Sequence, residues 1–422
     1  MSLRHLLVDI SPLRQSAAFR RVFAARVASL LGSGLVSVTV AVQVYDLTNS
    51  SLGVGLVELV FGVFLMFGFL AGGVIADRFD RKTVLLASGG ASVLVFVVMA
   101  LNALPAAQFL GVVFACAAVA GTAIGIEETA LSAVTPAVVE DDQLAAAGAL
   151  TAIAAEAGFI GGPMLAGFVI VMFDTTTSYA LTALCVGAST VLLFWLPSLR
   201  PDGDPEESPI DSIRSGLSYV VKTPIVRGIL LIDICTTLFV MPMVLFPELA
   251  DEFFGGGAQT VGLLYTAPAI GALIGSSLSG WTGRIPATGY ALIVVIIGWG
   301  AMVVGFGLSP NIPVAMCFLA GMGMFDAYSE IFRRALIQHY TPDELQARVS
   351  SLWLATATAW PSMGDIVTGV ASRLVGPTVA LVGGGLVSVG SAVASPVLLP
   401  GIRQATLSGP SADALKAKAD VS

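Results

Sequence analysis

The side chains of this chain most able to do chemistry are isolated charges within long apolar segments. A charge retained inside a membrane helix costs free energy, so it is by default a candidate for binding a substrate or a proton. The apolar segments carry such charges at Arg26, Glu58, Glu156, Asp233, Asp326, Glu330 and Asp365. We expect these side chains to face a cavity or one another.

One group of these charges has helical spacing. Asp326, Glu330 and Arg334 follow at intervals of four residues, with Arg333 adjacent, so they lie on one face of a helix. A partly desolvated carboxylate on that face could take up and release a proton. Asp326 lies deeper in its segment and is the preferred proton site, whereas Glu330 could form a permanent ion pair with Arg334.

An internal repeat relates two more of these charges. Sliding the chain against itself by about 207 residues aligns Gly55 with Gly262 and Arg26 with Asp233. Opposite charges therefore occupy related positions, and two explanations are open. The two residues could pair in one state of a transport cycle, or each could have its own local partner.

Membrane helices must position these charges. Of the 422 residues, 56% are hydrophobic and 11% are charged, and the mean hydropathy is +0.90, which excludes a soluble globular protein. Apolar runs of about 20 residues, enough to cross the hydrocarbon of a bilayer, recur about twelve times. We place them at 19–44, 52–75, 83–102, 109–131, 144–172, 178–197, 224–247, 259–281, 287–308, 312–337, 348–373 and 378–398.

The turns between these runs divide the chain into two halves. They are short except between the sixth and seventh runs, where a stretch with several prolines and acidic residues intervenes. We predict an all-α integral membrane protein with a six-helix bundle at 1–199, a cytoplasmic linker at 200–223, a second six-helix bundle at 224–400 and a cytoplasmic tail at 401–422. Parallel repeats of this kind are typical of two bundles related by an axis along the membrane normal.

Basic residues predict the orientation of the helices. Short translocated loops are depleted in Lys and Arg, and nearly all of these residues fall on one side of the predicted membrane. Both termini are therefore predicted to be cytoplasmic. The net charge of −8 is dispersed and no basic stripe exists, so nucleic acid is not an expected partner.

A compact charged turn, GGVIADRFDRK at residues 72–82, joins the second and third apolar runs. It resembles the loop between helices 2 and 3 of major facilitator transporters. The residues that carry this resemblance are Gly73, Asp77, Arg78 and Arg81. By that resemblance Asp77 would contact the N-terminus of helix 11, near Arg348, and close the cytoplasmic side. Its loop partners would be Arg78 and Arg81, with Glu127 or Glu128, whereas the simpler interpretation of Asp77 is a helix cap.

The fifth apolar run contains a Gly-Pro kink flanked by small residues, which permits close contact between helices. The residues concerned are Gly158, Gly162, Pro163 and Gly167. The pattern resembles the antiporter motif of proton-coupled exporters. A general packing seam around a kinked helix is the alternative.

Other chemistries lack their motifs. The chain has no Gly-Lys-Ser/Thr phosphate loop, no HExxH, no paired CxxC and no nucleophile elbow. The four cysteines lie within predicted helices without the spacing of metal ligands. We therefore expect no ATP-driven transport by this chain alone, no enzymatic activity, no cofactor and no bound metal.

The order of motifs along nearly the whole chain resembles the enterobactin-exporter branch of the major facilitator superfamily. Besides the charged turn, the segments that carry this resemblance are FRRVFAAR at 19–26, AVTPAVV at 133–139 and the stretch from Thr341-Pro342 through Leu352-Trp353.

This resemblance implies a monomeric secondary exporter in the inner membrane. It would move a catecholate-like siderophore or similar aromatic molecule outward in exchange for protons, by alternating access. A multidrug or macrolide-type efflux antiporter is the close alternative, and a membrane receptor or scaffold without transport is a remote one.

Overall fold

The computed structural model describes residues 10–140, 143–199 and 209–407. Within these ranges the chain is helical and forms no strand. The first part contains α1 (Ser11–Gln15), α2 (Ala17–Thr48), α3 (Ser51–Arg78), α4 (Arg81–Asn102), α5 (Leu110–Val138), α6 (Leu144–Met172) and α7 (Thr175–Phe194).

The remaining helices begin at residue 209, where the described part of the chain resumes. They are α8 (Pro209–Lys222), α9 (Pro224–Phe239), η3 (Pro242–Leu245), α10 (Phe246–Glu252), α11 (Gly257–Ser277), η4 (Ser279–Arg284), α12 (Thr288–Gly307), α13 (Ile312–His339), α14 (Asp343–Val375), α15 (Pro377–Leu398) and α16 (Pro400–Gln404). Residues 209–222 of the expected linker therefore form a helix of their own, whereas most of the expected tail lies outside the described residues.

Eleven spans in the described part of the chain are long and apolar enough to cross a membrane. Six of them correspond to α2 to α7, and one runs from Pro224 to Glu252 across α9, η3 and α10. The other four are α11, α12, α13 and α15. The helix α14 has 33 residues, which exceeds the length that a span needs, but it is more polar than the others. With α14 the twelve helices of the predicted fold are accounted for.

The helices form two compact units. The first unit consists of residues 1–49, 56–205 and 255–266, and the second consists of residues 50–55, 206–254 and 267–422. The first turns of α3 thus pack in the second unit, and the first half of α11 packs in the first unit.

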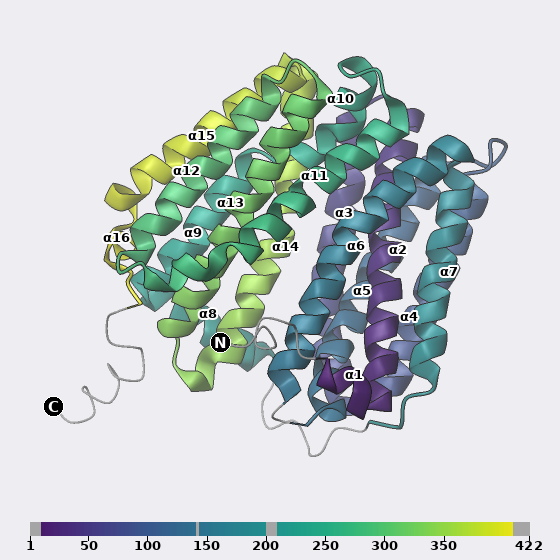
Figure 1. The fold of residues 1–422 in the computed structure, drawn as a ribbon, viewed down its shortest axis with the longest axis horizontal. Helices are drawn as coiled ribbons and strands as arrows, with labels where there is room; N and C mark the ends of the chain where they lie inside the picture. Colours follow the sequence, from purple (N-terminus) through teal and green to yellow (C-terminus); the bar gives the residue numbers. More distant parts are fainter. Residues whose placement is uncertain (1–9, 141–142, 200–208, 408–422) are drawn as a thin grey trace, which may run out of the picture. The chain divides into compact units, whose positions relative to one another are not determined.

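In the first unit, α2 lies against both α6 and α7, and α4 lies against α5 and α7 (Figure 1). Glycines allow the closest of these contacts. A Cβ atom on Gly34 of α2 would lie 2.8 Å from the carbonyl oxygen of Gly158 and 2.8 Å from the Cα atom of Gly162, both on α6. A larger residue at Gly34 would therefore force α2 and α6 apart.

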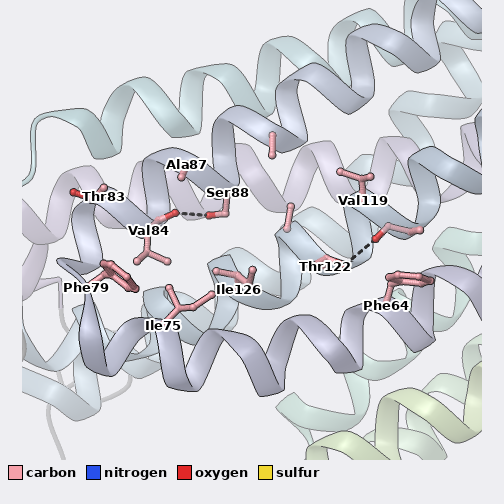
Figure 2. Close-up of a pocket in the computed structure, with 13 residues that line it drawn as sticks. Phe64, Ile75, Phe79, Thr83, Val84, Ala87, Ser88, Val119, Thr122 and Ile126 are labelled. Atoms are coloured by element: carbon pink, nitrogen blue, oxygen red, sulfur yellow. Dashed lines mark hydrogen bonds between the residues drawn. The ribbon is translucent and has the colours of Figure 1, made fainter. Parts of the chain in front are cut away.

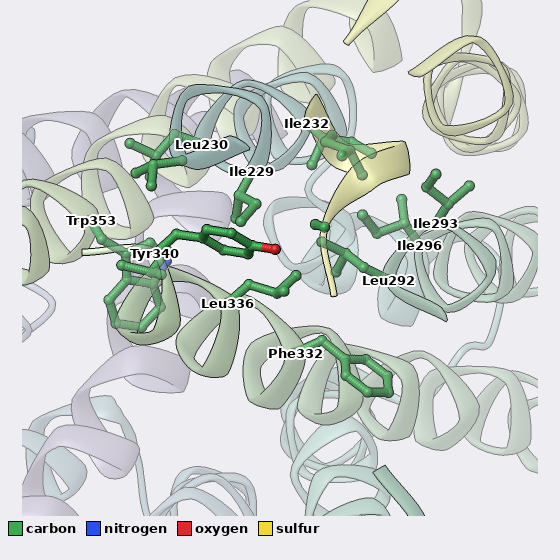
Figure 3. Packing of buried hydrophobic residues seen from close by; sticks show 14 of the residues in the cluster. Ile229, Leu230, Ile232, Leu292, Ile293, Ile296, Phe332, Leu336, Tyr340 and Trp353 are labelled. Carbon is green, nitrogen blue, oxygen red and sulfur yellow. The ribbon is translucent and has the colours of Figure 1, made fainter. Parts of the chain in front are cut away.

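In the second unit, α12 lies between α13 and α15, and α9 contacts α14 and α15. A buried apolar cluster joins these helices around Ile229, Leu292 and Leu336 (Figure 3). The hydroxyl of Tyr340, at the end of α13, donates a hydrogen bond of 2.9 Å to the carbonyl oxygen of Thr406. This contact ties the segment after α16 to the cluster.

The predicted seventh helix is the one most altered. It was expected as one run over 224–247, but α9 ends at Phe239 and a 3₁₀ helix begins at Pro242. Proline lacks the amide hydrogen that a continuing helix needs. The amide of Met241 instead donates a hydrogen bond of 2.8 Å to the hydroxyl of Thr368 on α14. The break is therefore held by a side chain from another helix.

Candidate functional site

The charged face of α13 forms a network in the second unit. Arg333 is 8% exposed, and its guanidinium pairs with the carboxylate of Asp233 on α9, which is 4% exposed. The Nε atom of Arg333 also donates a hydrogen bond of 3.3 Å to the carbonyl oxygen of Ser329. Two opposite charges buried together stabilise each other, whereas either one alone would be strongly destabilising.

Two further carboxylates approach the same guanidinium. An oxygen of Asp326 lies 3.7 Å from Nη2 of Arg333, and an oxygen of Glu330 lies 4.0 Å from it. The side chain of Asp326 is 64% exposed, compared with 9% for Arg333. Asp326 is therefore the carboxylate of this network most accessible to a proton or a ligand.

Glu330 has a second partner on the same helix. It accepts a hydrogen bond of 2.7 Å from Arg334, whose guanidinium lies 5.0 Å from the centre of the Trp353 ring. This is the local pair expected from the sequence as the alternative to a proton role for Glu330. The network thus contains the carboxylates of Asp233, Asp326 and Glu330 and the guanidinium groups of Arg333 and Arg334.

The first unit holds a simpler arrangement. Arg26 on α2 pairs with Glu128 on α5, and the two side chains are 20% and 35% exposed. The adjacent Glu127 is 7% exposed, and within the described part of the chain it has no hydrogen bond or ion pair. Arg26 and Asp233, which are aligned by the repeat, therefore each have a local partner in this structure.

The sequence offered Glu127 or Glu128 as a further partner of Asp77, whose side chain lies outside what the structure describes. Glu128 contacts Arg26, which lies 102 positions away along the chain. These two glutamates were not included among the intramembrane charges that were selected from the sequence as candidate sites. The available signal was that both interrupt an apolar run, as the selected candidates do.

The charged turn is shorter than its sequence suggested. Helix α3 continues to Arg78 and α4 begins at Arg81, so only Phe79 and Asp80 lie outside helices. Asp77 is in the last turn of α3, and its side chain is outside what the structure describes.

The carboxylate of Asp80 caps α4, because it accepts hydrogen bonds from the amide of Lys82 at 3.1 Å and the amide of Leu199 at 2.9 Å. It also accepts a hydrogen bond of 2.7 Å from the hydroxyl of Ser198. Asp80 was missed as a capping residue, although an aspartate directly before a helix is a common N-cap.

The Gly-Pro segment that was expected to kink its helix lies within α6, which contains Pro163. Gly158 and Gly162 contact α2, and a Cβ on Gly167 would lie 3.0 Å from the carbonyl oxygen of Ala258 in the part of α11 that belongs to the first unit. The small residues therefore provide close packing on two sides of α6.

Of the remaining candidates, Asp365 is 9% exposed on α14. Glu58 on α3 faces a pocket in the first unit. The side chain of Glu156 on α6 lies outside what the structure describes. Among the described residues, no group of three His, Cys, Asp or Glu side chains could hold a metal ion.

A crevice of about 550 Å³ opens between α3, α4 and α5 of the first unit (Figure 2). Phe64, Phe79 and Ile126 are among its lining residues. The hydroxyls of Ser88 and Thr122 donate to carbonyl oxygens of their own helices at 2.9 and 3.0 Å. The crevice therefore presents an apolar wall suited to hydrocarbon.

A further hydrogen-bonded carboxylate lies within the second unit. Glu248 of α10 accepts hydrogen bonds from the hydroxyl of Ser372 at 3.0 and 3.1 Å and from the hydroxyl of Ser51. Ser51 and Ser372 are 3% and 4% exposed. Glu248 thus joins the first turn of α3 to the end of α14, a contact that the sequence did not suggest.

Nearly the whole chain matches known membrane proteins. The profile of the transmembrane secretion effector family matches residues 8–413. The enterobactin exporter EntS of Shigella dysenteriae serotype 1 is 31% identical over 377 residues, covering 89% of this chain and 90% of that protein. The enterobactin exporter EntS of Citrobacter koseri is 32% identical over 392 residues, covering 92% of this chain and 94% of that protein.

Solved structures of transporters share the fold. A POT family transporter in complex with 5-aminolevulinic acid has a TM-score of 0.74 at 12% identity, covering 92% of this chain and 97% of that one. The nucleoside transporter NupG also has a TM-score of 0.74 at 12% identity, with 90% and 99% of the two chains covered. At this identity the likeness shows the architecture alone.

Proposed function

The chain belongs to the transmembrane secretion effector family of the major facilitator superfamily, whose members are transporters, and we propose that it exports a catecholate-like siderophore in exchange for protons. The observation that supports the substrate is the similarity, along about nine-tenths of the chain, to proteins named enterobactin exporters. We further propose that it acts as a monomer in the inner membrane with both termini in the cytoplasm, as the distribution of basic residues suggests.

The α13 network supports an exchange mechanism. The hydroxyls of a catechol are hydrogen-bond donors, and an ionised carboxylate can only accept. The exposed carboxylate of Asp326 would therefore bind the catechol. Arg333, which is fixed by Asp233, would stabilise the negative charge of the Asp326 carboxylate. A proton on Asp326 would remove an acceptor and release the catechol. Substrate and proton would then compete for one group, which is the requirement for antiport.

Alternating access would expose this group first to one side of the membrane and then to the other. The parallel repeat supports this proposal, because transporters built from such repeats cycle largely by rocking one half against the other. The glycine contacts of α6 would allow helices to slide at short range, and Asp77 would hold the cytoplasmic side closed during part of the cycle.

The substrate is tested in iron-starved cells with and without this protein. Catecholate siderophore is measured in the cytoplasm and in the medium by absorbance after chromatography. Deletion should raise the cytoplasmic amount and lower the secreted amount, and the intact gene should reverse both changes. Unchanged secretion together with altered drug sensitivity would reject the siderophore and favour the multidrug alternative.

A further inference from the structure

A small pocket inside the first unit has a chemical character different from the α13 network. It has a volume of about 220 Å³ and lies between α2, α3, α4 and α5. Among the described residues that line it, Glu58 alone carries a charge. The pocket therefore places one carboxylate inside an otherwise uncharged enclosure.

The carboxylate of Glu58 is not engaged by any of the groups that the structure describes. Within the described part of the chain it makes no hydrogen bond or ion pair, and the same holds for the hydroxyl of Ser33, which also lines the pocket. The hydroxyl of Ser37 is already used, since it donates 2.9 Å to the carbonyl oxygen of Gly34. Glu58 and Ser33 thus offer acceptors to whatever occupies the pocket.

The rest of the wall is suited to a cation with apolar parts. Phe61 and Phe96 contribute aromatic rings, and Met99 contributes a polarisable thioether. Phe96 and Met99 are 4% and 3% exposed, so their contacts are largely shielded from water. An ammonium group near an aromatic face is attracted by the ring, and this attraction strengthens when water is excluded.

Comparison with the crevice of Figure 2 shows what is special about this pocket. The crevice is larger, but its Ser88 and Thr122 hydroxyls are bonded to the main chain. It can accept hydrocarbon without recognising a charge. The Glu58 pocket instead combines a free acceptor, a negative charge and aromatic groups.

We propose that the Glu58 pocket is a binding site for a small organic cation, an arylalkylammonium ion with a single aromatic ring. Its volume lies below the roughly 300–1,000 Å³ of ordinary ligand pockets, which favours a ligand of that size over a drug-sized molecule. The ammonium group contacts the Glu58 carboxylate and the ring lies among Phe61, Phe96 and Met99. This site is separate from the proposed siderophore exchange and does not depend on it.

The test uses the full chain in nanodiscs of phosphatidylcholine, which carries no net charge. Binding of phenethylammonium is measured by equilibrium dialysis to the wild type, to Glu58→Gln and to Glu140→Gln, a matched control at an exposed position outside the helices. The neutral alcohol 2-phenylethanol serves as the ligand control.

The wild type and Glu140→Gln should bind phenethylammonium equally, and Glu58→Gln should bind it roughly tenfold or more weakly because its partner charge is gone. The neutral alcohol 2-phenylethanol should bind the wild type and Glu58→Gln equally well. Equal binding of the cation to the wild type and Glu58→Gln would overturn the proposal. So would an absence of binding to the wild type, which would leave a proton or water as the occupant.

Discussion

The two halves of the chain place opposite charges at positions related by the repeat, and they surround these charges differently. In the first unit Arg26 has one partner, Glu128, and both side chains are partly exposed. In the second unit Asp233 is buried against Arg333, and two further carboxylates lie within 4.0 Å of the same guanidinium. One half holds a pair, and the other holds a network.

This difference shows what the repeat does and does not preserve. Both halves carry a charged residue at the related position, on α2 in one half and on α9 in the other. The sign of the charge and the residues that pair with it differ between the halves. In the first unit, Arg26 and Glu128 neutralise each other's charge as a simple pair. In the α13 network, Asp326 is exposed and can change its proton without breaking the buried pair beneath it. We therefore propose that proton exchange takes place in the second unit and that the Arg26 pair has a structural role.

The largest effect is expected from Arg333→Met. It leaves the carboxylate of Asp233 buried without its cation, which should cost about 3–5 kcal/mol of unfolding free energy. Unfolding in mixed detergent micelles measures the loss. Adding Asp233→Asn should recover much of the stability but not the transport, because the guanidinium beside the Asp326 carboxylate is still missing.

The matching change in the first unit is Arg26→Met. Glu128 is 35% exposed and can be hydrated, so the expected cost is only about 1 kcal/mol. If Arg26→Met destabilised the protein as much as Arg333→Met, the contrast between the two units would be wrong.

The next effect concerns transport alone. Asp326→Asn removes the exposed carboxylate and should lower uptake of enterobactin into inverted vesicles, driven by a pH gradient, by at least about tenfold, equivalent to 1.4 kcal/mol. Its stability should remain near that of the wild type, because the side chain is 64% exposed. Glu330→Gln is the control within the same helix, and it should lower uptake less because Glu330 is paired with Arg334. A larger loss in Glu330→Gln would move the proton site to Glu330.

The smallest effects are expected at the charged turn, where two aspartates separate a structural role from a gating role. Asp80→Ala removes the cap of α4 and should cost about 1 kcal/mol of stability.

Asp77→Asn should slow turnover and favour the inward-open state while leaving stability unchanged. Thermal unfolding and cysteine accessibility distinguish the two variants, and unaltered turnover and accessibility in Asp77→Asn would reject its role as a gate.

The helices could be predicted because their signals are local. The limits of α6, residues 144–172, agree with the expected ones, since apolar composition and the flanking polar turns mark both ends. The break between α9 and η3 was not predicted as an interruption of the helix, although Pro242 was visible. Its position depends on Thr368, which lies on another helix.

The candidate site was predictable in its residues but only partly in its contacts. The stripe on α13 follows from helical spacing, so the pair of Glu330 and Arg334 was foreseeable. The partners of Arg26 and Asp233 are brought near by folding, and spacing along the chain carries no information on them. Asp326 differs from its neighbours by exposure, which depends on the packing of several helices.

Proton release on substrate binding tests the central claim most directly. Enterobactin is added to the purified chain in weakly buffered detergent solution, and the pH change is followed with a dye. The wild type and Arg26→Met should release protons, whereas Asp326→Asn should release none, even at enterobactin concentrations that saturate its weakened site. Release from Asp326→Asn equal to that of the wild type would contradict the assignment of proton exchange to the α13 network.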